Sequence, residues 1–147
     1  MFSTDITKEF LEDHNWSEQN DGSYLVFKSG AFTYYKDKND KDNYFYTGHY
    51  KFYTGQDALD YVTEDLSDYG ITKEEMQGVF DRNEKYDLSN FVCLVLENEE
   101  CIIDGENTLD KTVVSPYYGF YLNDGVNKAL DMANMNTGTY FYFVPED

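Results

Sequence analysis

Basic residues are scarce in this chain. Of its 147 residues, 29 are acidic and 11 are basic, so the formal net charge is −18, and Arg82 is the only arginine. Proteins bind nucleic acids and anionic lipid surfaces through clustered lysine and arginine side chains. The shortage therefore excludes a protein that binds nucleic acid directly or that sits on an anionic membrane.

Cysteines and long apolar runs are also scarce. Two cysteines, Cys93 and Cys101, are too few for a disulfide framework or a four-thiolate zinc site, and we expect two reduced thiols. No apolar run approaches the length of a membrane span. Residues 1–5 lack the basic start and apolar core of a signal peptide. We therefore expect a cytoplasmic protein.

Catalytic and metal-binding motifs are missing as well. The chain has no Gly-rich phosphate loop, HExxH, GxSxG or CxxC. Its two histidines, His14 and His49, lie in no local signature that would pair them with a cysteine as base and nucleophile. The acidic loop 37–48 departs from the calcium-binding EF-hand pattern, with Asp42 in place of glycine and Gly48 in place of glutamate. We expect no enzyme, no cofactor and no metal site.

Aromatic residues, by contrast, make up 18% of the chain, which argues against intrinsic disorder. The spacing of apolar residues predicts four helices: over 5–14, over 54–69, one that starts at Thr72 and one that starts at Asp124. It predicts strands over 22–28, 31–35, 44–53, 90–96, 101–104 and 138–144. A charged turn is expected at 97–100. Ser29 and Gly30 predict a tight hairpin turn between the strands 22–28 and 31–35, and Gly48 predicts a bulge or a turn in 44–53. Strands and helices do not alternate regularly. We therefore expect an α+β fold, a single domain over 1–147 with a mainly antiparallel sheet packed by about four short helices.

The last predicted strand alternates two aromatic residue types. Tyr140 and Tyr142 point to one side, and Phe141 and Phe143 to the other. Phenylalanine has no polar atom, so its side should face the core, while tyrosine leaves its hydroxyl in water. The segment 44–46 repeats the pattern. The tyrosine side is either a half-exposed sheet surface or a surface that binds a partner.

Acidic residues are concentrated in two segments. The 54–69 helix carries five acids and no base, and at 3.6 residues per turn four of them fall within an arc of about 80°. Like charges at this spacing destabilise an isolated helix by roughly 0.2–0.5 kcal/mol per pair. A second acidic segment spans 97–106. The candidate partner-binding residues are Asp57, Asp60, Glu64, Asp65, Asp68, Glu97, Glu99, Glu100 and Asp104.

A row of carboxylates on a helix is similar to the charge row of a nucleic-acid backbone. In size, acidity and lack of catalytic motifs, with the 57–68 stripe and the 97–106 segment, the chain resembles the small acidic inhibitors that phages deploy against host nucleases. These include anti-CRISPR proteins and antirestriction DNA mimics. The resemblance implies a non-enzymatic inhibitor that occupies the basic nucleic-acid-binding surface of a CRISPR effector or restriction nuclease in a bacterial cytoplasm.

Two other interpretations fit the same residues. An immunity protein that neutralises a basic toxin would show the same charge and the same lack of catalytic motifs. Alternatively, the acidic face contributes only to solubility.

Overall fold

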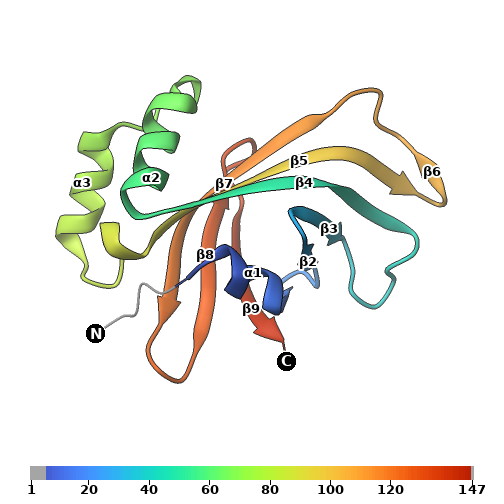
Figure 1. Ribbon diagram of the computed structural model, residues 1–147, viewed down its shortest axis with the longest axis horizontal. Helices are drawn as coiled ribbons and strands as arrows, with labels where there is room; N and C mark the ends of the chain where they lie inside the picture. Colours follow the sequence, from blue (N-terminus) through green and yellow to red (C-terminus); the bar gives the residue numbers. More distant parts are fainter. Residues whose placement is uncertain (1–5, 147) are drawn as a thin grey trace.

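A computed structural model describes residues 6–146, in which eight antiparallel strands close into a barrel (Figure 1). The barrel strands are β1 (Asn15–Glu18), β2 (Tyr24–Lys28), β3 (Ala31–Tyr35), β4 (Tyr44–Thr54), β5 (Phe91–Ile103), β7 (Val113–Asn123), β8 (Lys128–Asn134) and β9 (Tyr140–Glu146). Each of these strands pairs with the next one along the chain, and β9 pairs with β1 to close the ring. A ninth strand, β6 (Glu106–Asn107), extends β5 as a short hairpin outside the ring.

The helical segments lie in two places. One short helix, α1 (Lys8–Asp13), covers one end of the barrel. The others join β4 to β5 and form a layer outside the barrel: α2 (Gly55–Asp60), the π-helix η1 (Tyr61–Asp65), the 3₁₀ turn η2 (Ser67–Tyr69), α3 (Lys73–Arg82) and the 3₁₀ turn η3 (Leu88–Asn90). The expected α+β sheet packed by about four short helices is therefore wrong. The sheet closes on itself because β9 pairs with β1, so its main core lies inside the ring rather than under helices.

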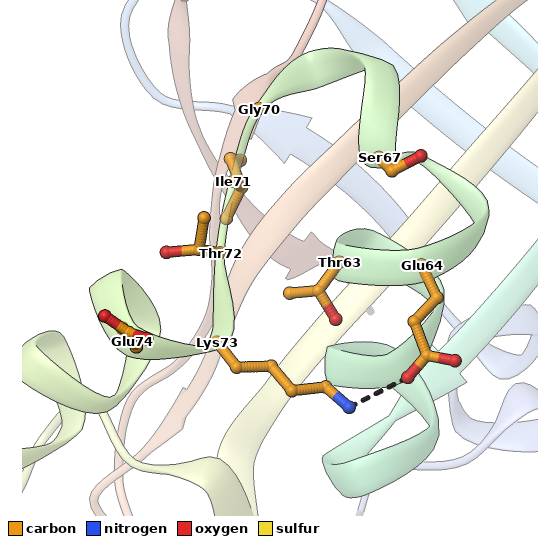
Figure 2. Close-up of a pocket in the computed structure, with 8 residues that line it drawn as sticks. All are labelled: Thr63, Glu64, Ser67, Gly70, Ile71, Thr72, Lys73 and Glu74. Carbon is orange, nitrogen blue, oxygen red and sulfur yellow. Dashed lines mark hydrogen bonds and ion pairs between the residues drawn. The ribbon is translucent and has the colours of Figure 1, made fainter.

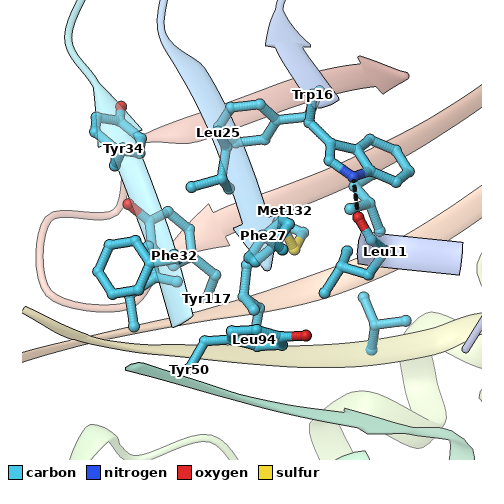
Figure 3. Close-up of a cluster of buried hydrophobic side chains, with 14 of the residues drawn as sticks. Leu11, Trp16, Leu25, Phe27, Phe32, Tyr34, Tyr50, Leu94, Tyr117 and Met132 are labelled. Carbon is cyan, nitrogen blue, oxygen red and sulfur yellow. Dashed lines mark hydrogen bonds between the residues drawn. The ribbon is translucent and has the colours of Figure 1, made fainter. Parts of the chain in front are cut away.

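Every second residue of the barrel strands points inward. Trp16 lies opposite Leu25, and Phe27 lies opposite Phe32. The indole Nε1 of Trp16 donates a hydrogen bond to the carbonyl oxygen of Leu11, which ties α1 to this core (Figure 3). The buried inner residues are Leu11, Trp16, Leu25, Phe27, Phe32, Tyr34, Tyr50, Val92, Leu94, Leu96, Tyr117, Tyr121, Leu130, Met132 and Phe143, with Ile6 beside them.

A second core lies between the helical layer and the outer face of β5 and β7. Its buried members are Ala58, Leu59, Val62, Met76, Phe80, Phe91, Cys93, Val95, Phe120 and Leu122. Residues 91–96 are consequently buried on both faces of the sheet. This explains why the segment reads as one continuous apolar run, which is the pattern of a strand covered on both sides.

The predicted helix from Asp124 and the predicted turn at 97–100 are wrong. The helix expected from Asp124 is a turn followed by β8, because β7 and β9 supply hydrogen-bonding partners on both sides of this segment. Leu130 and Met132 point into the barrel and Ala133 points out, so the helical spacing of apolar residues there was coincidental. The turn expected at 97–100 is also absent, since β5 continues through Ile103 along the whole length of β4.

The predicted bulge at Gly48 is confirmed. The register of β4 against β5 shifts between Thr47 and Gly48. A Cβ atom on Gly48 would lie 1.9 Å from the carbonyl oxygen of Glu97, so only glycine lets the two strands approach this closely. The hairpin predicted at Ser29 and Gly30 is confirmed too, with φ angles of 52° and 83°.

The expected alternation of aromatic faces holds in one strand and fails in the other. In β9, Phe143 is buried in the barrel and Tyr140 is exposed, as expected. In β4 the pattern is reversed: Tyr46 packs against the inner core and Phe45 lies on the outer side, beside Tyr35. Residue type alone did not settle the direction, because both rings can be half-buried there.

Candidate functional site

The acidic segment between β4 and β5 is three short helical pieces rather than one straight α-helix. In η1 the backbone N–H of Leu66 donates to the carbonyl oxygen of Tyr61, which is the five-residue spacing of a π-helix. Leu66 then leaves the helical conformation, with φ −104° and ψ 32°. Asp68 therefore belongs to a separate 3₁₀ turn, and the acids do not form the regular row that an ideal helix would give.

Two of the predicted stripe acids are paired within the chain. The Nζ atom of Lys73 lies 2.8 Å from Glu64 Oε2 (Figure 2) and 3.4 Å from Asp60 Oδ1. Gln56 also donates to Asp60, and the Gln56 hydrogen bond together with Lys73 lowers the pKa of the Asp60 carboxyl. Lys73 begins α3 and thus offsets part of the repulsion between these acids, which the sequence pattern alone did not indicate.

The other three acids remain open to solvent. Asp57, Asp65 and Asp68 are exposed, and within residues 6–146 their side chains form no ion pair or hydrogen bond. Residues 55–90 carry ten acidic and three basic residues, for a net charge of −7. The helical layer is therefore the outer face on which unpaired carboxylates are available to a partner.

A shallow hollow lies between the two halves of this layer. It has a volume of about 470 Å³ and is lined by Thr63, Glu64, Ser67, Gly70, Ile71, Thr72, Lys73 and Glu74 (Figure 2). The predicted helix start at Thr72 forms its edge, where the hydroxyl of Thr72 accepts a hydrogen bond from the backbone N–H of Glu75. The hollow is wide open to solvent, so it is a depression in the acidic layer rather than an enclosed pocket.

The second group of predicted acids lies elsewhere on β5 and its turn. Each of its strand residues contacts a side chain of β4: Glu97 lies 3.8 Å from Lys51, Glu99 lies 2.9 Å from His49, and Glu100 accepts a hydrogen bond from Thr47. Asp104 stands in the tight β5–β6 turn with φ 51°, and its backbone N–H donates to Asn43. The carboxylates of Glu97, Glu99 and Glu100 therefore have partners within the barrel wall, whereas the exposed Asp104 carboxylate has none within residues 6–146.

The two acidic groups approach each other only near Tyr61, where, besides burial, the charges of Asp65 and Glu97 both help to raise the pKa of the tyrosine hydroxyl, and Asp104 lies far from the helical layer. The helical layer follows Thr54, which pairs with Val92, whereas Asp104 follows Ile103 at the other end of β5. Eleven residues of strand at about 3.4 Å each separate these ends by roughly 35–40 Å. In Figure 1, α2 and α3 lie at one end of the long β4–β5 pair and β6 at the other.

A contact that sequence reasoning missed joins the helical layer to the tyrosine side of β9. The hydroxyl of Tyr69 donates to Asn136 Oδ1 at 2.7 Å, in the turn that leads to Tyr140. Tyr69 is 40% exposed and Tyr140 is 76% exposed, and both line one hollow of about 160 Å³ together with Tyr118 and Met135. The end of the acidic stripe, at Asp68 and Tyr69, is therefore next to the exposed Tyr140.

The cysteines and histidines occupy structural positions. Cys93 is buried beneath the helical layer, and this burial raises the pKa of its thiol to about 12, so the thiol is protonated at neutral pH. Cys101 is also buried and free. His14 Nδ1 lies 3.2 Å from the carbonyl oxygen of Phe10, and His49 pairs with Glu99 as described above.

Within residues 6–146, no helix combines the length and apolar character needed to cross a membrane. In the same residues, no cluster of three or more His, Cys, Asp or Glu side chains is arranged to hold a metal ion. Comparison of the chain with protein-family models, with curated proteins and with solved structures finds no significant match.

Proposed function

We propose that this protein is a non-enzymatic inhibitor that binds the basic nucleic-acid-binding surface of a CRISPR effector, a restriction nuclease or a similar protein. The contact surface is the acid–tyrosine face, which we define as Asp57, Asp65, Asp68, Tyr69 and Tyr140. The observation that carries the proposal is that Asp68, at the end of the exposed acids of the helical layer, adjoins Tyr69, which lines one hollow with the exposed Tyr140.

The carboxylates and the tyrosines contribute to binding in different ways. Exposed carboxylates that lack an internal partner attract a basic surface over long range and speed the encounter. Tyr69 and Tyr140 provide flat contact area of the kind enriched at protein interfaces. Since Asp57, Asp65 and Asp68 break no ion pair on binding, their full charge is available to lysine and arginine side chains of the partner.

In this proposal the helical layer mimics the high negative charge of a nucleic acid, and not the regular spacing of its phosphates. The break between η1 and η2 and the pairing of Asp60 and Glu64 with Lys73 remove the regular row. The remaining net charge of −7 over residues 55–90 still presents a strongly negative surface to a groove that binds nucleic acid. The proposed targets act in the bacterial cytoplasm, and the proposal places this protein there.

The test is competitive capture by charge-matched variants. The purified protein is used to capture partners from a bacterial lysate, and captured proteins are identified and challenged with DNA or RNA. We expect to capture a nuclease or other nucleic-acid-binding protein. Added nucleic acid and added salt should both release it from this protein. The triple variant Asp57→Lys, Asp65→Lys, Asp68→Lys should lose capture at least tenfold.

The matched control is the triple variant Asp42→Lys, Glu106→Lys, Asp110→Lys, which makes the same charge change at exposed positions outside the helical layer. It should capture the partner normally. Equal loss in both variants would show that only net charge matters, and equal retention would show that the face is not the contact. Capture of a basic toxin with no competition by nucleic acid would support the immunity-protein alternative instead.

A further inference from the structure

The barrel end opposite α1 is hollow. Figure 3 shows Trp16 with Leu11 on one side of the inner cluster and Tyr34 with Tyr117 on the other. Beyond these two tyrosines lies a cavity of about 480 Å³, lined by residues of six barrel strands and of the loops at this end. Its volume falls in the range of small-molecule sites, which occur in the mouths of barrels.

One polar side chain in this mouth has unused hydrogen-bonding capacity. Asn98 is only 5% exposed, and its amide nitrogen donates to the carbonyl oxygen of Val113 and to Ser115 Oγ. Within residues 6–146 its Oδ1 atom accepts no hydrogen bond, although every fully buried side-chain nitrogen or oxygen there has a partner. The Oδ1 atom is therefore reachable from the cavity and is an acceptor held in place by the amide nitrogen.

Aromatic rings form the apolar part of the lining. Tyr34 and Tyr46 meet edge to face at a centroid distance of 6.1 Å, and Tyr117 and Phe141 do so at 5.7 Å. The Tyr34 hydroxyl is already bound to Ser23, and burial raises the pKa of Tyr117 to about 12, so the Tyr117 hydroxyl is neutral at physiological pH. These rings offer apolar walls without a charge.

The charges around the mouth disfavour an anionic occupant. Asp21 and Lys36 are the only charged residues in the lining within the described chain, and they are of opposite sign. The whole molecule carries a formal charge of −18, which repels anions from the opening.

We propose that the mouth binds a small, uncharged, ring-shaped molecule that donates an N–H or O–H group to Asn98 Oδ1 and packs its faces against the rings of Tyr34, Tyr117 and Phe141. Planar heterocycles and sugar rings share this chemistry. The site is distinct from the acid–tyrosine face, since its lining includes none of the five residues of that face, and Asn136, which accepts a hydrogen bond from Tyr69, lies between the two.

The experiment is a binding screen by NMR on the isotope-labelled full chain. The probes are uncharged nucleosides and monosaccharides, with nucleoside monophosphates and uronic acids as their anionic counterparts. We expect at least one uncharged probe to shift the side-chain amide signals of Asn98 and the resonances of Tyr117 and Phe141. The two probe families then identify whether the ring is a heterocycle or a sugar. The anionic counterpart of each uncharged probe that binds should bind at least tenfold more weakly.

A variant that fills the mouth completes the test. Thr139→Trp places a large ring at the exposed rim of the cavity and should abolish the shifts, while Val126→Trp, at the other end of the barrel, should leave them intact. The amide spectrum of each variant reports whether it is folded. Binding that survives Thr139→Trp, equal binding of anionic probes, or no shift at Asn98 with any uncharged probe would overturn the proposal.

Discussion

Tyr69 and Asn136 connect the helical layer to the mouth of the barrel through a hydrogen bond of 2.7 Å between the tyrosine hydroxyl and Asn136 Oδ1. The amide nitrogen of Asn136 donates in turn to the carbonyl oxygen of Val114. One asparagine thus holds η2, the β8–β9 turn and the start of β7 together. This contact sets the position of the exposed Tyr69 ring relative to Tyr140.

Removing the Tyr69 hydroxyl should loosen η2 without unfolding the barrel. We expect Tyr69→Phe to lower the free energy of unfolding by about 0.5–1 kcal/mol, because one partly exposed hydrogen bond is lost. Amide hydrogen exchange of residues 67–70 should accelerate. In Tyr140→Phe, the hydroxyl removed forms no hydrogen bond within residues 6–146, so urea unfolding should match the parent protein. If Tyr69→Phe and Tyr140→Phe had the same free energy of unfolding and the same amide exchange at residues 67–70, the structural role of Tyr69 would be contradicted.

Alanine at Gly48 should destabilise the barrel. The added Cβ would lie 1.9 Å from the Glu97 carbonyl oxygen, so β4 and β5 would have to separate at the bulge. We expect a loss of at least about 1–3 kcal/mol in urea unfolding, as for other overpacked sites. Gly78→Ala in α3 is the control: the nearest atom to its Cβ would be 3.7 Å away, and helix propensity predicts a gain of about 0.5–1 kcal/mol. Equal effects would show that the close approach at Gly48 is unimportant.

The attachment of α1 to the barrel should depend on pH. Glu12 accepts hydrogen bonds from the Tyr50 hydroxyl and from the backbone N–H of Gly30, and these bonds lower the pKa of its carboxyl below 4.5. A lowered pKa in the folded state adds stability above the unfolded-state pKa, and this contribution disappears as pH falls through the folded-state pKa.

The variant Glu12→Gln measures that contribution. We expect it to be less stable than the parent protein near neutral pH, with the difference shrinking as the pH is lowered below about 4. Thermal or urea unfolding at several pH values provides the measurement. Glu9→Gln, on the exposed side of α1, should show a small difference at every pH. If the stability difference between Glu12→Gln and the parent protein does not change with pH, the proposed role of the carboxylate is ruled out.

Neither cysteine should react with iodoacetamide in the native protein at neutral pH. Cys93 lies beneath the helical layer with a raised thiol pKa, and Cys101 is buried in the barrel wall. The thiolate is the reactive form, and both access and ionisation are blocked at Cys93. Mass spectrometry should find both thiols modified in urea and neither in buffer. Rapid modification of Cys93 in buffer would mean that the helical layer detaches readily.

Turns and helix starts that depend only on neighbouring residues could be predicted from the sequence. Ser29 and Gly30 form the expected hairpin because the two-residue turn needs positive φ angles at both positions. Thr72 starts α3 because its hydroxyl satisfies a free backbone N–H of the first turn. The predicted helix from Asp124 failed because apolar residues at helical spacing also fit a strand whose neighbours supply a ladder on both sides.

The candidate site was predictable in part. The exposed acids Asp57, Asp65 and Asp68 and the exposed Tyr140 follow from composition and alternation. The pairing of Lys73 with Asp60 and Glu64 was not visible, because it depends on how α3 turns back after Gly70. The mouth cavity was not visible either, since its lining comes from segments spread over more than a hundred residues of the chain.

The strong negative charge, the turn at Ser29–Gly30, the bulge at Gly48 and the inward phenylalanines of β9 follow from residue type and near neighbours, so they can be derived from the amino-acid sequence. The pairing of β1 with β9, the distance between Asp104 and the helical layer, and the contact of Tyr69 with Asn136 emerge only in the folded chain. These contacts join residues far apart along the chain, and a closed ring forms only when all its strands are paired at once.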